Sequence, residues 1–114
     1  YASSEYLLSG LPVVSTSNYG GRDVFFNDEF CINTLPIPQS IKNASYDLIK
    51  KEIDPSYIRN STIKKMKPHL DRFQELLENI FNEYGIDLDI KSNWKQLYTN
   101  KMLNYGIKFP QGLV

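Results

Sequence analysis

The sequence predicts an α/β fold with few parallel strands and a mostly helical carboxyl-terminal part. Leu11 to Ser15 is a compact, valine-rich run that suits a strand buried on both faces. A second short strand is predicted from Glu29 to Thr34. Most of the chain after Gln39 follows the spacing of amphipathic helices instead.

The composition narrows the classes of function. The 114 residues suffice for one domain or a piece of one, and 13 basic residues balance 13 acidic ones. A net charge of zero gives no electrostatic footprint for nucleic acid or a membrane surface. The single cysteine, Cys31, excludes an internal disulfide framework and favours a reducing, cytoplasmic location. The first residue is Tyr1 rather than methionine, so we expect a piece of a longer protein.

The amino-terminal stretch is a helix, a strand and a polar loop. Ser3 to Ser9 can form a short helix that Gly10 ends. The strand from Leu11 follows, and Ser15 to Gly21 then form a glycine-bearing loop at its carboxyl end. Because open α/β sheets bind ligands at that end of their strands, this loop and the preceding carboxylate of Glu5 predict a ligand-binding edge.

These residues resemble a known family. The run from Glu5 to Thr16 (EYLLSGLPVVST), followed by Gly20 to Val24 (GGRDV), resembles the carboxyl-terminal nucleotide-sugar-binding domain of GT-B glycosyltransferases. It is most similar to the retaining group whose signature is two glutamates separated by seven residues. Glu5 falls on the second glutamate, and the first would precede Tyr1. The resemblance covers about a fifth of the chain.

The resemblance implies a partial Rossmann-like fold and a sugar transfer from a nucleotide-diphosphate-sugar donor to an acceptor hydroxyl. Glu5 would accept hydrogen bonds from the two ribose hydroxyls of the donor. The phosphate or sugar side would be lined by Ser15, Thr16, Gly20 and Gly21. No catalytic residue carries over, and neither a metal nor a cofactor is implied. The alternatives are a solvated helix-end glutamate and an ordinary strand-to-helix loop.

The expected partners are the donor, the acceptor and the missing amino-terminal part of the same enzyme, without which the piece would be inactive. Membrane association is supported only by the Lys64, Lys65 and Lys67 cluster, which is more simply a solvated face. Two other interpretations stay open. One is a non-catalytic helical interaction module, and the other is a different nucleotide-sugar-binding α/β protein such as an epimerase.

The sequence also predicts roles for Arg22, His69 and Cys31. Arg22 could neutralise a diphosphate, but we favour an ion pair with a neighbouring acid, one of Asp23, Asp28 and Glu29. His69, the only histidine, is expected to be structural or solvated. Cys31 is expected to be a small buried hydrophobe.

Helices are predicted through most of the remaining chain. One covers Gln39 to Lys51, and another starts at Pro55 with Asp54 as its N-cap. Pro68 predicts a kink or a break. Beyond Pro68 an apolar stripe is expected to anchor the core, and it comprises Leu70, Phe73, Leu76, Leu77, Ile80, Phe81 and Tyr84.

Gly85 ends this helix, and Ser92 is predicted to cap a last helix that reaches Gly106. The predicted organisation is therefore residues 1–53 as the end of the nucleotide-sugar-binding domain, residues 54–106 as its closing helices, and residues 107–114 as a tail.

Overall fold

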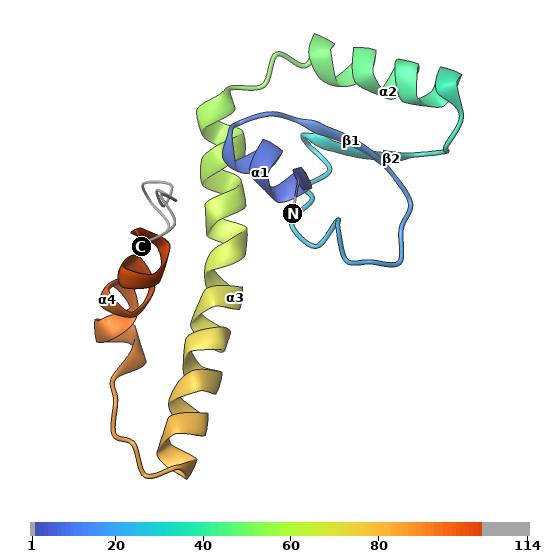
Figure 1. The fold of residues 1–114 in the computed structure, drawn as a ribbon. Helices are drawn as coiled ribbons and strands as arrows, with labels where there is room; N and C mark the ends of the chain where they lie inside the picture. Colours follow the sequence, from blue (N-terminus) through green and yellow to red (C-terminus); the bar gives the residue numbers. More distant parts are fainter. Residues whose placement is uncertain (1, 104–114) are drawn as a thin grey trace. The chain divides into compact units, whose positions relative to one another are not determined.

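The computed structural model describes residues 2–103, with four helices and a two-stranded sheet among them (Figure 1). In chain order the elements are α1 (Ala2–Leu8), β1 (Val13–Thr16), β2 (Cys31–Thr34), α2 (Pro38–Lys50), α3 (Pro55–Glu83) and α4 (Ile90–Leu103). The mixture of helices and strands confirms the predicted α/β class. The described residues divide into two compact units, residues 2–65 and residues 66–103, and the boundary falls within the sequence of α3.

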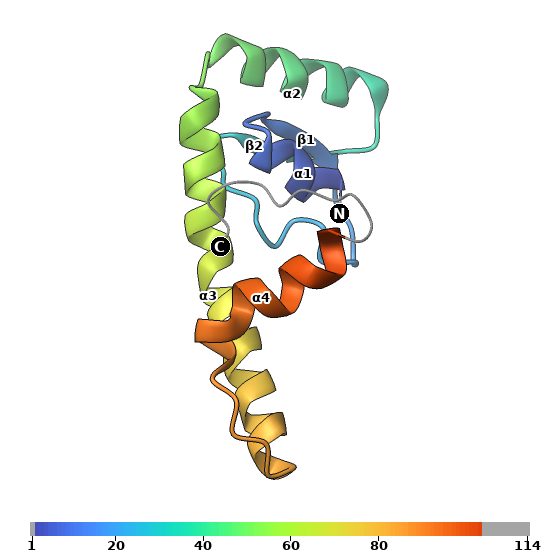
Figure 2. The same cartoon turned by 60° about the vertical axis from the view of Figure 1, so that its left-hand side comes forward.

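The first unit is built around the sheet. β1 and β2 pair in parallel, with Val13 opposite Cys31 and Thr16 opposite Thr34, as predicted. α2 lies over one face of the sheet and α1 over the other (Figures 1 and 2). Val14 is only half-buried and Leu11 is exposed outside the strand, so the prediction of a strand buried on both faces is wrong. The seven residues of α1 are too short to enclose their side of the sheet.

Side chains from four elements meet in the core of the first unit. The buried cluster consists of Leu7, Val13, Phe30, Cys31 and Ile58, and Phe25, Phe26 and Ile53 pack against it. Burying a large apolar side chain contributes roughly 1.5–3 kcal/mol before the entropy of ordering is subtracted. Because Ile58 is completely buried, the first turns of α3 belong to this core.

Gly10 joins the end of α1 to the start of α3. It has a φ of +80°, a conformation that side-chain-bearing residues avoid, and it ends the helix as predicted. A Cβ at Gly10 would lie 2.7 Å from both the Cβ and the carbonyl oxygen of Pro55. Arg59 also donates a hydrogen bond to the carbonyl of Leu8. Only glycine fits this close approach.

The second unit contains the rest of α3 and α4. The rings of Phe73 and Trp94 meet edge to face, with centroids 5.9 Å apart, and Ile90 at the start of α4 is completely buried. The prediction that the apolar stripe anchors the core is wrong, because Leu76 is 53% exposed and Tyr84 is 79% exposed. Among the described residues α4 alone packs on this part of α3, and one helix cannot cover the whole stripe.

Of the kink or break predicted at Pro68, the break is excluded. α3 continues through Pro68, because one lost backbone hydrogen bond does not end a helix of 29 residues. The predicted cap of the last helix is wrong. Asp89, rather than Ser92, caps α4. Its Oδ1 accepts the backbone N–H of Ser92 at 3.0 Å, and its Oδ2 accepts the Ser92 hydroxyl at 2.6 Å. The predicted helix end at Gly106 and the tail lie outside the described residues.

Candidate functional site

The loop at the carboxyl end of β1 is held in place by Arg22. The backbone N–H of Arg22 donates to Oδ1 of Asn18 at 3.3 Å, and its guanidinium donates to the carbonyl of Thr16 at 3.0 Å. Its own carbonyl accepts the hydroxyl of Ser3 at 2.9 Å. These three hydrogen bonds close the loop upon itself and tie it to the start of α1.

The predicted ion pair of Arg22 is wrong. Within the described part of the chain, its guanidinium contacts none of the neighbouring carboxylates. The backbone carbonyl at the end of β1 offers a nearer acceptor, because the loop curls back over the strand end. Arg22 is therefore a structural brace of the loop.

Asn18 organises the turn and has one unsatisfied group. Its Oδ1 accepts the backbone N–H groups of Gly20, at 3.0 Å, and of Arg22. This arrangement leaves Nδ2 buried, with no hydrogen-bond partner among the described residues. Buried donors in proteins nearly always have an acceptor. The Nδ2 of Asn18 is therefore available to donate a hydrogen bond to a ligand.

Gly20 and Gly21 differ in what the fold requires of them. Gly21 has a φ of +67°, which explains a glycine at that position. Gly20 lies outside the left-handed region, and a Cβ added to it would meet only Oδ1 of Asn18, at 3.8 Å. Packing and backbone geometry therefore do not require glycine at position 20, and the space beside it is open.

Ser15 and Thr16 lie half-buried at the end of β1. The hydroxyl of Ser15 donates to the carbonyl of Thr16 at 3.2 Å, so this carbonyl accepts both Ser15 and Arg22. Four of the five predicted site residues are thus in one strand end and its loop. They are Ser15, Thr16, Gly20 and Gly21.

Glu5, the fifth, is exposed on α1, and no described residue pairs with its carboxylate. Ser3 and Leu7 mark the buried side of that helix, and Glu5 lies two residues from each. Because successive residues turn by about 100°, Glu5 lies on the opposite side of α1. Its link to the loop runs through the hydrogen bond between Ser3 and Arg22.

Sequence reasoning overlooked Ser3 and Asn18. Asn18 could have been found, because an asparagine two residues before a glycine is a common turn signal. Ser3 could not, because its partner Arg22 is 19 residues away in the sequence. Cys31 is buried as predicted, and this burial raises the pKa of its thiol. His69 is exposed on α3.

No protein-family model, curated protein or solved structure matches this chain. Within residues 2–103, no helix is both long enough and apolar enough to cross a membrane. The same part of the chain contains no group of three or more His, Cys, Asp or Glu side chains placed to hold a metal ion.

Proposed function

We propose that this chain is the carboxyl-terminal part of the nucleotide-sugar-binding, Rossmann-like domain of a retaining GT-B glycosyltransferase. The observation that carries the proposal is the glycine-bearing loop, which leaves the carboxyl end of β1 beside a parallel neighbour. α/β proteins bind nucleotides at this edge of their sheets. The enzyme moves a sugar from a nucleotide-diphosphate donor to an acceptor hydroxyl, and acts in the cytoplasm together with its amino-terminal part.

The phosphate or sugar part of the donor lies against Ser15, Thr16, Gly20 and Gly21. Two features of the loop support this assignment. The open space beside Gly20 allows an atom of the donor to approach the backbone closely. The unpaired Nδ2 of Asn18 is a donor suited to a phosphate or sugar oxygen.

Glu5 accepts the ribose hydroxyls of the donor. Its carboxylate is exposed and unpaired among the described residues, so it is available to a ligand. The hydrogen bond from Ser3 to Arg22 ties the same helix to the loop, and the resemblance supplies the role of Glu5 on the other side of that helix. Each charged hydrogen bond to ribose contributes about 1.5–3 kcal/mol.

The test is donor binding by the full-length protein, measured by isothermal titration calorimetry with a panel of nucleotide-diphosphate sugars. Glu5→Ala should weaken binding at least about tenfold, because two charged hydrogen bonds are lost. Glu75→Ala, which removes another exposed glutamate, should leave the affinity unchanged. Equal affinities of the wild type and Glu5→Ala would contradict the assignment. A glutamate upstream of Tyr1 at the family spacing would support it independently.

A non-catalytic interaction module is the second candidate. The observation that favours it is the exposed apolar stripe of α3, where Phe73, Leu76, Ile80 and Tyr84 are each more than 40% exposed. Size-exclusion chromatography with light scattering separates the two candidates. A stable, monodisperse assembly without affinity for nucleotides favours the module, whereas a monomer that binds nucleotide-diphosphate sugars favours the transferase.

A further inference from the structure

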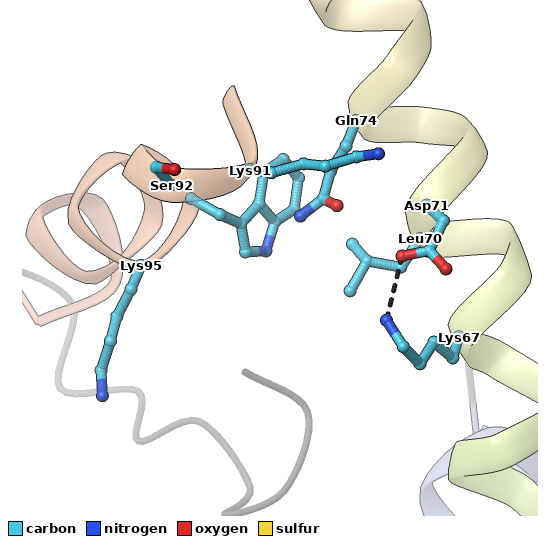
Figure 3. A pocket seen from close by; sticks show the side chains of 8 residues that line it. Lys67, Leu70, Asp71, Gln74, Lys91, Ser92 and Lys95 are labelled. Atoms are coloured by element: carbon cyan, nitrogen blue, oxygen red, sulfur yellow. Dashed lines mark hydrogen bonds and ion pairs between the residues drawn. The ribbon is translucent and has the colours of Figure 1, made fainter. Parts of the chain in front are cut away.

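A cavity of about 300 Å³ lies between the second half of α3 and α4, inside the second unit (Figure 3). α3 lines it with Leu70 and Gln74, and α4 lines it with Lys91, Trp94 and Lys95. Pockets for small molecules span roughly 300–1,000 Å³, so this cavity has the size for a small ligand.

Gln74 is a largely buried polar residue in the lining of this cavity. It is only 6% exposed, yet its side-chain amide pairs with no described residue. Figure 3 shows the side chain reaching from α3 towards α4, beside Lys91. The amide lines the cavity, so its N–H donors and its carbonyl acceptor are available to an occupant.

The charges around the cavity favour an anion. Three ammonium groups and one carboxylate line it, and the Lys67 ammonium pairs with Asp71 at 3.1 Å. Lys91 and Lys95 are left without a carboxylate in the lining. The nearby Glu78 carboxylate accepts the backbone N–H of Lys91 at 3.4 Å. Leu70 and the Trp94 indole add apolar surface.

We propose that this cavity binds a small organic anion. The phosphate or carboxylate of the ligand faces Gln74 and Lys91, and its apolar group packs on Leu70 and Trp94. The site belongs to the second unit and shares no residue with the loop after β1. The proposal therefore does not depend on nucleotide-sugar binding.

Trp94 is the only tryptophan in the chain, so its fluorescence reports on the cavity directly. The probes are phenyl phosphate and benzoate, with inorganic phosphate and phenol as the charged and apolar halves. We expect a saturable change in Trp94 emission with at least one of the two aromatic anions, weaker binding of either half, and loss of affinity as salt is added.

Variants identify the residues that bind. Lys91→Gln should weaken binding about two- to fivefold, as for an exposed charge, and Gln74→Leu at least about tenfold. Lys50→Gln, which removes an exposed lysine from α2, is the matched control and should change nothing. If Gln74→Leu fails to fold, Lys91→Glu decides, because position 91 is exposed and reversing its charge should abolish binding of the anion.

The proposal is overturned if neither aromatic anion gives a saturable change, or if phenol binds as well as phenyl phosphate. It is also overturned if Lys50→Gln weakens binding as much as Lys91→Gln, because the anion would then respond only to the overall charge of the protein.

Discussion

The two units use similar apolar sequence with different results. In the first unit, Leu7, Phe30 and Ile58 come from three separate segments and are at most 1% exposed. In the second, Leu76 and Ile80 lie on the most regular apolar stripe of the chain, yet they are 53% and 41% exposed.

The difference shows that apolar periodicity alone does not make a core. A strand pair with a helix on each face brings side chains together from several directions, so those at its centre are enclosed. A helix pair encloses only the line along which the two helices meet, and Gln74 and Ile90 lie on that line. The apolar stripe on α3 stays exposed because, among the described residues, α3 has one neighbouring helix there rather than two.

The largest expected effect concerns Gly10. Gly10→Ala places a Cβ 2.7 Å from Pro55 in a backbone conformation with φ of +80°. Strain and overpacking together should lower the free energy of unfolding by about 2–6 kcal/mol. Gly85→Ala is the matched control, because Gly85 also has a positive φ but a Cβ there meets nothing within 4 Å. It should cost only about 1–2 kcal/mol. Urea unfolding followed by circular dichroism measures both, and equal losses would contradict the close contact with Pro55.

The next effect compares one chemical change in the two units. Leu7→Ala empties a completely buried position and should cost about 2–5 kcal/mol. Leu76→Ala removes a side chain that is 53% exposed and should cost less than about 1 kcal/mol. The same urea experiment measures the pair. A cost at Leu76 as large as that at Leu7 would mean that the stripe is covered in solution.

The smallest effect concerns the acid stability of α4. The hydroxyl and backbone N–H of Ser92 donate to Asp89 and lower the pKa of its carboxyl group below the ordinary value of 3.8. The folded pKa is thus lower than the unfolded one. The stabilisation is fully present above the unfolded value and is lost as the pH falls through the folded one.

Asp89→Ala should therefore reduce the hydrogen-exchange protection of the first turn of α4 at neutral pH and remove its change with acid. Asp87→Ala, at an exposed position outside the helix, is the control and should behave as the wild type. Identical acid profiles for the two variants would show that Asp89 is not the cap.

Much of the fold was predictable because its signals are local. The two strands, the stop at Gly10 and the helix after Pro38 all follow from residues within a few positions of one another. The contact of Gly10 with Pro55 and that of Ser3 with Arg22 were not predictable, because their partners are distant in the sequence. The helix-breaking signal of Pro68 is overridden by the long helix on both sides of it. The capping signal of Ser92 is overridden by Asp89, whose carboxylate caps the helix instead.

The candidate site also has a part that the sequence predicts locally and a part that depends on tertiary packing. Ser15, Thr16, Gly20 and Gly21 come together because they are close in the sequence and follow one strand. The position of Glu5 relative to them depends on how α1 packs, which the sequence does not encode locally. The assignment of Glu5 to ribose rests on the resemblance alone and stays a prediction.

The most direct test of nucleotide-sugar binding is the backbone amide NMR signal of Gly20 and Gly21 in the full-length protein, labelled at glycine and titrated with nucleotide-diphosphate sugars. The account predicts saturable shifts at Gly20 and Gly21 and none at Gly85, which is in the second unit. Saturable donor binding that leaves Gly20 and Gly21 unmoved, or no binding of any nucleotide-diphosphate sugar, would contradict it.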